Sequence, residues 1–342
     1  MPFSTGAFCR SCDMSICNDE NPRAGLTRRS FVVGCAAAGA TTMLGTRSGF
    51  APIPVIDTHI HLFDSTRPQG APYAGPGGVS PKVSLPDRYR KLAEPLGIVG
   101  AIKVEASPWI EDNLWALQVA QKDTIMVGVV GNLQPEKPEF PEYLARYHRN
   151  PLFRGIRYGN LWNYDLSEQV RNARFIEGLR LLAQADLVLD TANPDIQLLE
   201  AVVRVSDKVP DLRVVIDHLP KLETMPSTQA AYDNVLLELR QRTNVFVKLS
   251  SVIHRVNGQL STDLASHRDR LARLMNVFGE DRVLFGSDWP NSDGVAPIDK
   301  VVGIVRAYFE AQPRSVAEKY FWKNSMRVYK WIRRTPDQPG EG

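Results

Sequence analysis

Four residues with the chemistry to take part in hydrolysis stand at or just after the ends of short apolar runs. They are His59, His61, His218 and Asp288. Because side chains two positions apart lie on the same side of a strand, His59 and His61 should point the same way. Three imidazoles and one carboxylate form a donor set that suits one divalent ion, typically zinc. The pattern therefore predicts one site that combines all four side chains.

Further polar and aromatic residues end neighbouring runs and would surround this site. They are Glu105, Arg157, Tyr158, Lys248 and Trp289. We expect the charged and hydroxyl groups among them to bind a carboxylate or hydroxyl of the substrate, and ion pairs within the core are the alternative role. Three tryptophans are expected either to form apolar walls of the site or, as single tryptophans more often do, to belong to the core: Trp109, Trp162 and Trp289.

Two aspartates precede the predicted ligands, and strand alternation predicts a different role for each. Asp57 lies two residues before His59 and should share its face, where its carboxylate would orient the imidazole. Asp217 directly precedes His218, so it should point to the opposite face and have a structural role.

Eight apolar runs alternate with segments of helical periodicity from residue 53 onward. The runs cover residues 53–57, 99–104, 125–130, 153–158, 187–190, 212–217, 245–249 and 283–285. Alternating strands and helices indicate an α/β fold with a parallel sheet, and eight units is the number of a (β/α)8 TIM barrel. We predict one barrel domain over residues 51–335, whose active site lies at the carboxyl ends of its strands.

The remaining segments complete this picture. Helices are expected over residues 112–122, 170–184, 196–209, 230–242 and 264–278, followed by two more over 297–311 and 316–332. The long connections 64–87 and 158–167 are expected to line the site. Residues 336–342, rich in Pro and Gly, are expected to form a disordered tail.

Residues 1–50 are predicted to be an export signal of the twin-arginine type with a flexible N-terminus. Arg28 and Arg29 are followed by Phe31 and by a weakly apolar stretch over residues 33–44. A charged segment before a short apolar one is typical of a secretory signal, and paired arginines indicate the route taken by folded proteins. We therefore expect a periplasmic or secreted protein without an integral membrane segment once the signal is removed.

Charge and cysteine content exclude other classes of protein. The net charge of the 342-residue chain is +3, and residues 1–49 hold five arginines against three acidic residues. The nearly neutral remainder argues against a nucleic-acid partner and leaves a small-molecule substrate. Residues 1–49 also hold every cysteine of the chain, so the barrel can have neither disulfides nor a thiolate metal site: Cys9, Cys12, Cys17 and Cys35.

Three motifs resemble those of the amidohydrolase superfamily, in its amidohydrolase-related branch of lactonases and TIM-barrel metal-dependent hydrolases. They are Val-Ile-Asp-Thr-His-Ile-His at 55–61, Val-Ile-Asp-His-Leu-Pro-Lys at 215–221 and Leu-Phe-Gly-Ser-Asp-Trp-Pro at 284–290. The resemblance implies that Asp288 activates water, with His218 beside it in catalysis. It also implies that His59, His61, His218 and Asp288 hold the metal, or that the imidazoles bind the substrate carbonyl directly.

The number of metal ions follows from departures from this pattern. Binuclear members carry a carboxylated lysine on the fourth strand and a histidine on the fifth. Here the fourth strand reads Phe-Arg-Gly-Ile-Arg-Tyr, and the fifth ends at Asp190 and Thr191. The resemblance thus implies one divalent metal ion, zinc by preference, with metal-free catalysis as the alternative.

These observations favour hydrolysis of a lactone derived from a sugar or an aromatic acid. Two reactions of the same superfamily remain alternatives: amide hydrolysis and non-oxidative decarboxylation of aromatic acids. An alternative of another class is an exported barrel that binds a ligand without turning it over. The fold alone does not choose among them.

Overall fold

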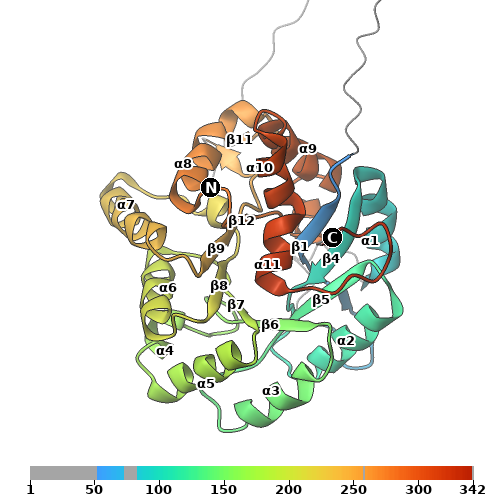
Figure 1. Cartoon of the computed structure of the whole chain (residues 1–342), viewed down its shortest axis with the longest axis vertical. Helices are drawn as coiled ribbons and strands as arrows, with labels where there is room; N and C mark the ends of the chain where they lie inside the picture. Colours follow the sequence, from blue (N-terminus) through green and yellow to red (C-terminus); the bar gives the residue numbers. More distant parts are fainter. Residues whose placement is uncertain (1–51, 73–82, 257–258, 341–342) are drawn as a thin grey trace, which may run out of the picture. The chain divides into compact units, whose positions relative to one another are not determined.

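The computed structural model describes residues 52–72, 83–256 and 259–340. Its centre is a sheet of eight parallel strands in the order β1-β4-β5-β6-β7-β8-β9-β12, surrounded by helices (Figure 1). The strands are β1 (Val55–Ile60), β4 (Ile98–Lys103), β5 (Met126–Gly131), β6 (Phe153–Arg157), β7 (Val188–Asp190), β8 (Arg213–Ile216), β9 (Val245–Lys248) and β12 (Val283–Leu284). The prediction of a (β/α)8 barrel is confirmed, with strand boundaries shifted by a few residues.

The barrel closes between its last strand and its first. Beyond β12 the chain continues alongside β1, where the Asp288 amide donates to the His59 carbonyl at 2.9 Å. The His61 amide in turn donates to the Trp289 carbonyl at 2.7 Å. These backbone bonds join the segments that carry His59, His61 and Asp288, so closure of the barrel itself brings the predicted ligands together.

Helices pack around the outside of the sheet. They are α1 (Pro86–Ala93), α2 (Asp112–Lys122), α3 (Phe140–His148), α4 (Leu166–Gln169), α5 (Ala173–Gln184), α6 (Ile196–Lys208), α7 (Pro226–Arg240), α8 (Arg268–Phe278), α9 (Ile298–Phe309), α10 (Arg314–Glu318) and α11 (Asn324–Tyr329). A π-helical turn at Lys319–Lys323 joins α10 to α11. In α6, the Asp195 side chain caps the first turn, and leucine, alanine and valine at helical spacing face the strands.

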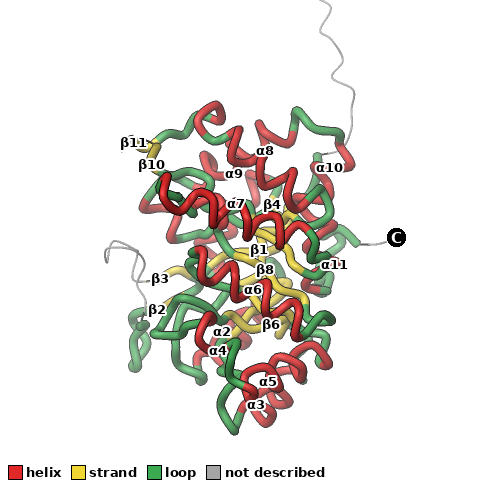
Figure 2. The backbone as a smooth tube through the Cα atoms, turned by 90° about the vertical axis from the view of Figure 1, so that its left-hand side faces the viewer, coloured by secondary structure: helices red, strands yellow, loops and turns green. Residues whose placement is uncertain are grey.

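Short elements lie in the connections between the main strands and helices. Two-stranded pairs form between β2 (Phe63–Asp64) and β3 (Val83–Ser84), and between β10 (Arg255–Val256) and β11 (Gln259–Leu260). Single 3-10 turns occur at Glu94–Leu96, Leu219–Lys221, Leu264–Ser266 and Asn291–Gly294. Figure 2 shows both small pairs at one end of the barrel and α11 at the opposite end.

The end of the barrel near α11 is closed by apolar packing. Val328, Tyr329 and Trp331 belong to the same buried cluster as the inward-facing strand residues Ile56 and Leu284. The Arg213 side chain at the start of β8 donates to the Val328 carbonyl at 2.8 Å, which places α11 at the amino ends of the strands. The open end is therefore the carboxyl end, where sites of this fold form.

The last residues are more ordered than their composition suggested. The Gln338 side chain is 1% exposed and donates to the carbonyls of Val99 (2.9 Å) and Thr124 (2.8 Å). The expectation of a disordered tail from residue 336 therefore does not fit residues 336–340, because one amide side chain satisfies two carbonyls at the amino ends of strands. The predicted export signal, with Arg28 and Arg29, lies outside the described residues. Within the described ranges, no helix is both long and apolar enough to cross a membrane.

Candidate active site

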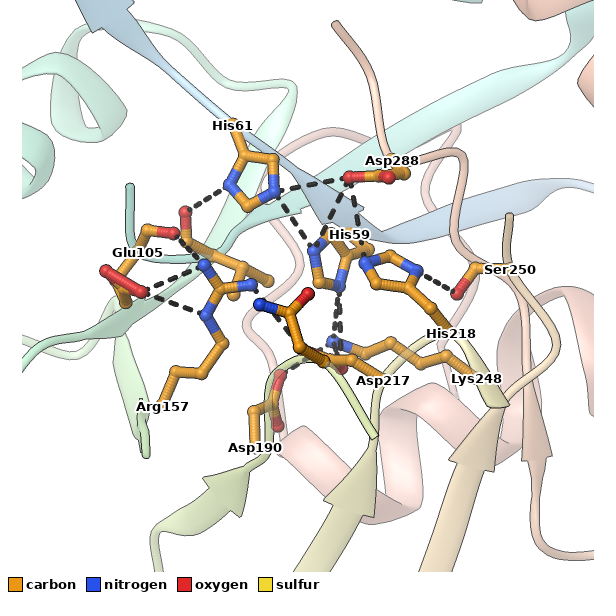
Figure 3. A network of polar contacts seen from close by, with 12 residues as sticks. His59, His61, Glu105, Arg157, Asp190, Asp217, His218, Lys248, Ser250 and Asp288 are labelled. Atoms are coloured by element: carbon orange, nitrogen blue, oxygen red, sulfur yellow. Dashed lines mark hydrogen bonds and ion pairs between the residues drawn. The ribbon is translucent and has the colours of Figure 1, made fainter. Parts of the chain in front are cut away.

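The four predicted ligands meet at the carboxyl end of the barrel (Figure 3). Asp288 Oδ1 lies 3.3 Å from His61 Nε2, 3.7 Å from His218 Nε2 and 3.9 Å from His59 Nε2. The two Nε2 atoms of His59 and His61 are 3.2 Å apart. Three segments distant in sequence thus direct one carboxylate oxygen and three ring nitrogens at a common point.

An irregularity in β1 determines which side chains face this point. Asp57 pairs with Ala101 and Ile60 with Lys103, so β1 contains one residue more than β4 over this stretch, as in a β-bulge. Because of the extra residue, side chains two positions apart across the bulge no longer lie on the same face, and Asp57 points away from the barrel interior. Its carboxylate accepts from the Tyr89 hydroxyl at 2.7 Å and from the His59 amide at 3.1 Å. Asp57 therefore holds the backbone of the bulge; the prediction that it shares the face of His59 and orients its imidazole is wrong.

Left-handed backbone conformations place the other two ligands. His218 has φ 54° and Asp288 φ 59°, a region in which histidine and aspartate occur more often than most side chains. Asp217 continues the alternation of β8 and points inward like Val215, and the left-handed conformation of His218 brings its own side chain to the same side. The Asp217 carboxylate lies 3.5 Å from His59 Nδ1 and 2.9 Å from Lys248 Nζ, beneath the imidazoles. The prediction that Asp217 points to the opposite face is wrong for this reason.

Burial and mutual charge set the protonation of the cluster. Burial, reinforced by Lys248, holds the pKa of His59 well below its usual 6.5, and burial also lowers the pKa of His218. For Asp288, burial raises the pKa, but the imidazoles of His218, His61 and His59 outweigh it and hold the pKa well below the usual range. Near neutral pH the site thus combines the uncharged imidazoles of His59 and His218 with an ionised carboxylate.

These groups fit a single divalent ion. The Nδ1–H of His61 donates to the Val104 carbonyl at 3.1 Å, which leaves the lone pair of Nε2 directed at Asp288 Oδ1. Two electron-rich atoms 3.3 Å apart favour a cation between them. Zinc bound tetrahedrally at ~2.0–2.1 Å separates its ligands by about 3.3 Å, close to the distances among the four donors. In the part of the chain that the structure describes, ligand atoms of His59, His218 and Asp288 form a potential metal-binding group within 4.8 Å of one another.

A buried ionic network lies immediately below. Lys248 is fully buried, and its Nζ contacts Asp190 (2.6 Å), Asp217 (2.9 Å) and His59 Nδ1 (3.2 Å). The Tyr329 hydroxyl from α11 also donates to Asp190, at 2.9 and 3.0 Å. Lys248 was predicted to bind substrate, but this placement does not support contact with a substrate, because its ammonium group is directed at buried carboxylates.

Glu105 and Arg157 form a second pair at the wall of the site. The Arg157 guanidinium donates to Glu105 Oε1 through Nε at 3.0 Å and through Nη2 at 2.9 Å. Glu105 also accepts from the Trp162 indole at 3.0 Å and from the Ser107 amide at 3.1 Å. Arg157 and Trp162 face the cavity described below, whereas the Glu105 oxygens are occupied in orienting them. Of these two predicted substrate contacts, Arg157 borders the cavity, whereas Glu105 contacts Arg157 and Trp162.

Two other predicted substrate contacts lie outside the barrel. Tyr158 stacks on Tyr164 with ring centroids 4.8 Å apart, within the core between strands and helices. Trp289 is fully buried against Tyr89, because the chain turns outward immediately after Asp288. Neither lines the cavity at the cluster. Trp109 lines a different hollow of about 460 Å³ beside α2 and α3.

A cavity of about 150 Å³, which we call the polar lobe, opens onto the cluster. Its lining includes His61, Arg157, Trp162, Asn193, His218 and Asp288. Two serines that were not predicted from the sequence contact the cluster. The Ser250 hydroxyl is hydrogen-bonded to His218 Nδ1 at 2.8 Å, and the Ser251 hydroxyl donates to Asp288 Oδ2 at 3.1 Å. The available signal was their position just past the seventh apolar run.

A parallel barrel with three imidazoles and a carboxylate at its strand ends defines a class of barrel hydrolases suited to one divalent ion. The chain belongs to the amidohydrolase family, whose model matches residues 56–331. This membership confirms the resemblance in the three motifs and makes the chain a hydrolase.

Sequence relatives and a solved structure agree with this assignment. The chain is 26% identical over 281 residues to an L-fucono-1,5-lactonase of Burkholderia multivorans, covering 78% of this chain and 92% of the relative. It is 28% identical over 251 residues to an L-fucono-1,5-lactonase of Burkholderia ambifaria, covering 69% and 80%. A crystal structure of a Burkholderia multivorans amidohydrolase with bound zinc aligns at a TM-score of 0.72 and 25% identity, covering 82% of this chain and all of that one.

Proposed function

We propose that this protein opens the ring of a lactone by adding water across its ester bond. The observation that carries the proposal is the convergence of the Asp288 carboxylate with the imidazoles of His59, His61 and His218, at the floor of the polar lobe. A carboxylate in this position can accept a proton from attacking water. The lactonase relatives support a lactone as the electrophile.

The reaction balances with the residues present. Water attacks the carbonyl carbon as Asp288 takes its proton, and the carbonyl π electrons move to the oxygen. Collapse of this intermediate breaks the ring carbon–oxygen bond, and protonated Asp288 returns the proton to the departing alkoxide. A divalent ion bound by His59, His61, His218 and Asp288 would stabilise the negative charge on oxygen. Arg157 is positioned to bind a hydroxyl or carboxylate of a sugar- or aromatic-acid-derived substrate.

The test is a panel of lactones, amides and aromatic acids assayed on protein of known metal content. Ring opening releases one acid equivalent without carbon dioxide, whereas decarboxylation releases carbon dioxide. Turnover of lactones above all other compounds would support the proposal. Turnover of amides or aromatic acids alone, or tight binding without turnover, would overturn it.

We further propose one divalent ion per chain, with zinc preferred. Asp190 lies at the end of β7, where binuclear relatives carry a histidine, and its carboxylate is engaged by Lys248 and Tyr329. Elemental analysis of purified protein should give about one equivalent. Two tightly bound equivalents would contradict this, and full activity near zero equivalents would favour the metal-free alternative.

We also propose that the folded protein is exported by the twin-arginine route, on the basis of Arg28 and Arg29. Replacing both with lysine should leave the precursor in the cytoplasm in a fractionation experiment. Normal export of that variant would overturn the proposal.

A further inference from the structure

A second cavity, of about 320 Å³, adjoins the polar lobe at Asp288. Lys221, Asp288 and Asn291 line both cavities. Its other walls combine aliphatic side chains with the polar residues Ser251, His254, Ser287 and Ser292. They come from the loop after β9, from β11, from the segment between β12 and α9, and from α9. We call this cavity the apolar lobe, and its aliphatic residues are Val252, Ile253, Leu260, Val295 and Val301.

The two lobes differ in the chemistry of their walls. The polar lobe presents a guanidinium from Arg157, an indole from Trp162 and an amide from Asn193. The apolar lobe presents the side chains of Val252 and Ile253, each shielded from bulk solvent but bordering the cavity. A ligand that filled both would need one hydrogen-bonding end and one hydrocarbon end.

Asp288 lies at the junction and faces both directions. Its Oδ1 points to the imidazoles, while its Oδ2 accepts from the Ser251 hydroxyl, which lines the apolar lobe. An ester carbonyl attacked beside Asp288 would therefore have its two substituents directed into different lobes.

We propose that the apolar lobe binds a hydrocarbon substituent on the lactone ring, so that the substrate class is lactones with one polar and one apolar side. This inference rests on the proposed lactonase function and adds to it the part of the substrate that determines specificity.

The test compares δ-valerolactone with δ-lactones that carry methyl, propyl or pentyl groups on the ring carbon bonded to oxygen. Each methylene that enters an apolar cavity should raise kcat/KM about fourfold, until the lobe is filled. The measurement is kcat/KM for each lactone with the metal-loaded, full-length protein.

Two variants narrow the lobe from different positions. Val295→Phe enlarges a side chain that is 43% exposed, so the core is not overpacked. Gly294→Phe adds a side chain where a Cβ would meet nothing within 4 Å, so it should fold even if Val295→Phe does not. Each should lower the ratio of kcat/KM for the pentyl lactone to that for δ-valerolactone by tenfold or more.

Leu237→Phe is the matched control, since Leu237 is 57% exposed on α7 and lines neither lobe. Its ratio and its absolute rates should equal those of the wild type. If δ-valerolactone is hydrolysed but alkyl groups give no gain, or if both lobe variants keep the wild-type ratio, this inference is overturned while the proposed function stands. If no lactone of any size is hydrolysed, both are overturned.

Discussion

The two ends of the barrel interior use polar residues in different ways. Toward the closed end, immediately beneath the imidazoles, Lys248, Asp190 and Tyr329 are joined by short hydrogen bonds and ion pairs, and the apolar packing of α11 lies below them. At the open end, Asp288 and the imidazoles direct lone pairs at one point and border a cavity. Charges that neutralise one another stabilise the fold, whereas charges that converge on a shared point are available for chemistry.

Lys248 and Lys221 illustrate the same difference within one residue type. Both lie just beyond or within the strand ends, but Lys248 is fully buried among carboxylates. Lys221 is exposed where the two lobes meet. Position at a strand end therefore does not make a lysine a substrate-binding residue, because the partners of its ammonium group determine whether it can reach a ligand.

The largest expected effect is on catalysis at the open end. Asp288→Asn keeps the shape of the side chain and removes the proton acceptor, so kcat should fall by about 10²–10⁴-fold while the melting temperature changes little. Single-turnover assays and thermal melts measure the two quantities. Substantial activity in this variant, together with a clear loss of stability, would place Asp288 with the structural groups instead.

The next effect is on stability at the closed end. Lys248→Met leaves the carboxylates of Asp190 and Asp217 buried without their cation, which should cost about 3–5 kcal/mol of unfolding free energy. Denaturant unfolding measures it. Lys221→Met is the matched control and should change stability by no more than about 0.5 kcal/mol, as for other surface positions. Equal losses in the two variants would contradict the division between the two ends.

The sequence predicted the positions of the functional residues correctly wherever the backbone keeps regular strand geometry. Periodicity located all eight strands, and strand-end placement located His59, His61, His218 and Asp288, because those inferences need only the order of the elements. The errors fell where the backbone departs from strand geometry. A bulge moved Asp57 to the outer face, and the left-handed conformation of His218 brought its side chain to the inner face beside Asp217.

Side-chain partnerships were the second limit. Nothing in the spacing of Glu105 and Arg157 shows that each satisfies the other, since Glu105 follows β4 and Arg157 ends β6, and the two side chains meet across the end of β5 only in three dimensions. The same holds for Tyr158, whose stacking partner Tyr164 comes from the following loop. Strand-end position thus predicts proximity to a site but not exposure to its ligand.

A further prediction concerns pH at the open end. Burial holds the pKa values of His59 and His218 below 6.5, so both imidazoles stay uncharged as the pH falls through 6.5, and the acid limb of kcat/KM should lie lower. At pH 5.5 an imidazole of ordinary pKa is only about one-tenth uncharged. We therefore expect at pH 5.5 clearly more than one-tenth of the activity seen at pH 7.5. An acid limb centred at pH 6.5 or above would contradict the burial of these rings in the working enzyme.

The smallest effect separates the two ends most sharply, because Tyr329 touches the network beneath the site without touching the site itself. Tyr329→Phe removes the hydrogen bond that the hydroxyl shares between the two oxygens of the Asp190 carboxylate and should cost about 1.5–3 kcal/mol of stability, with kcat/KM changed less than about threefold. Tyr320→Phe is its control, since the Tyr320 hydroxyl donates at 3.0 Å to the uncharged Leu249 carbonyl and its loss should cost about 1 kcal/mol. A tenfold fall in kcat with unchanged stability in Tyr329→Phe would show that Asp190 and Lys248 transmit the position of α11 to His59, and the two ends would then be one functional unit.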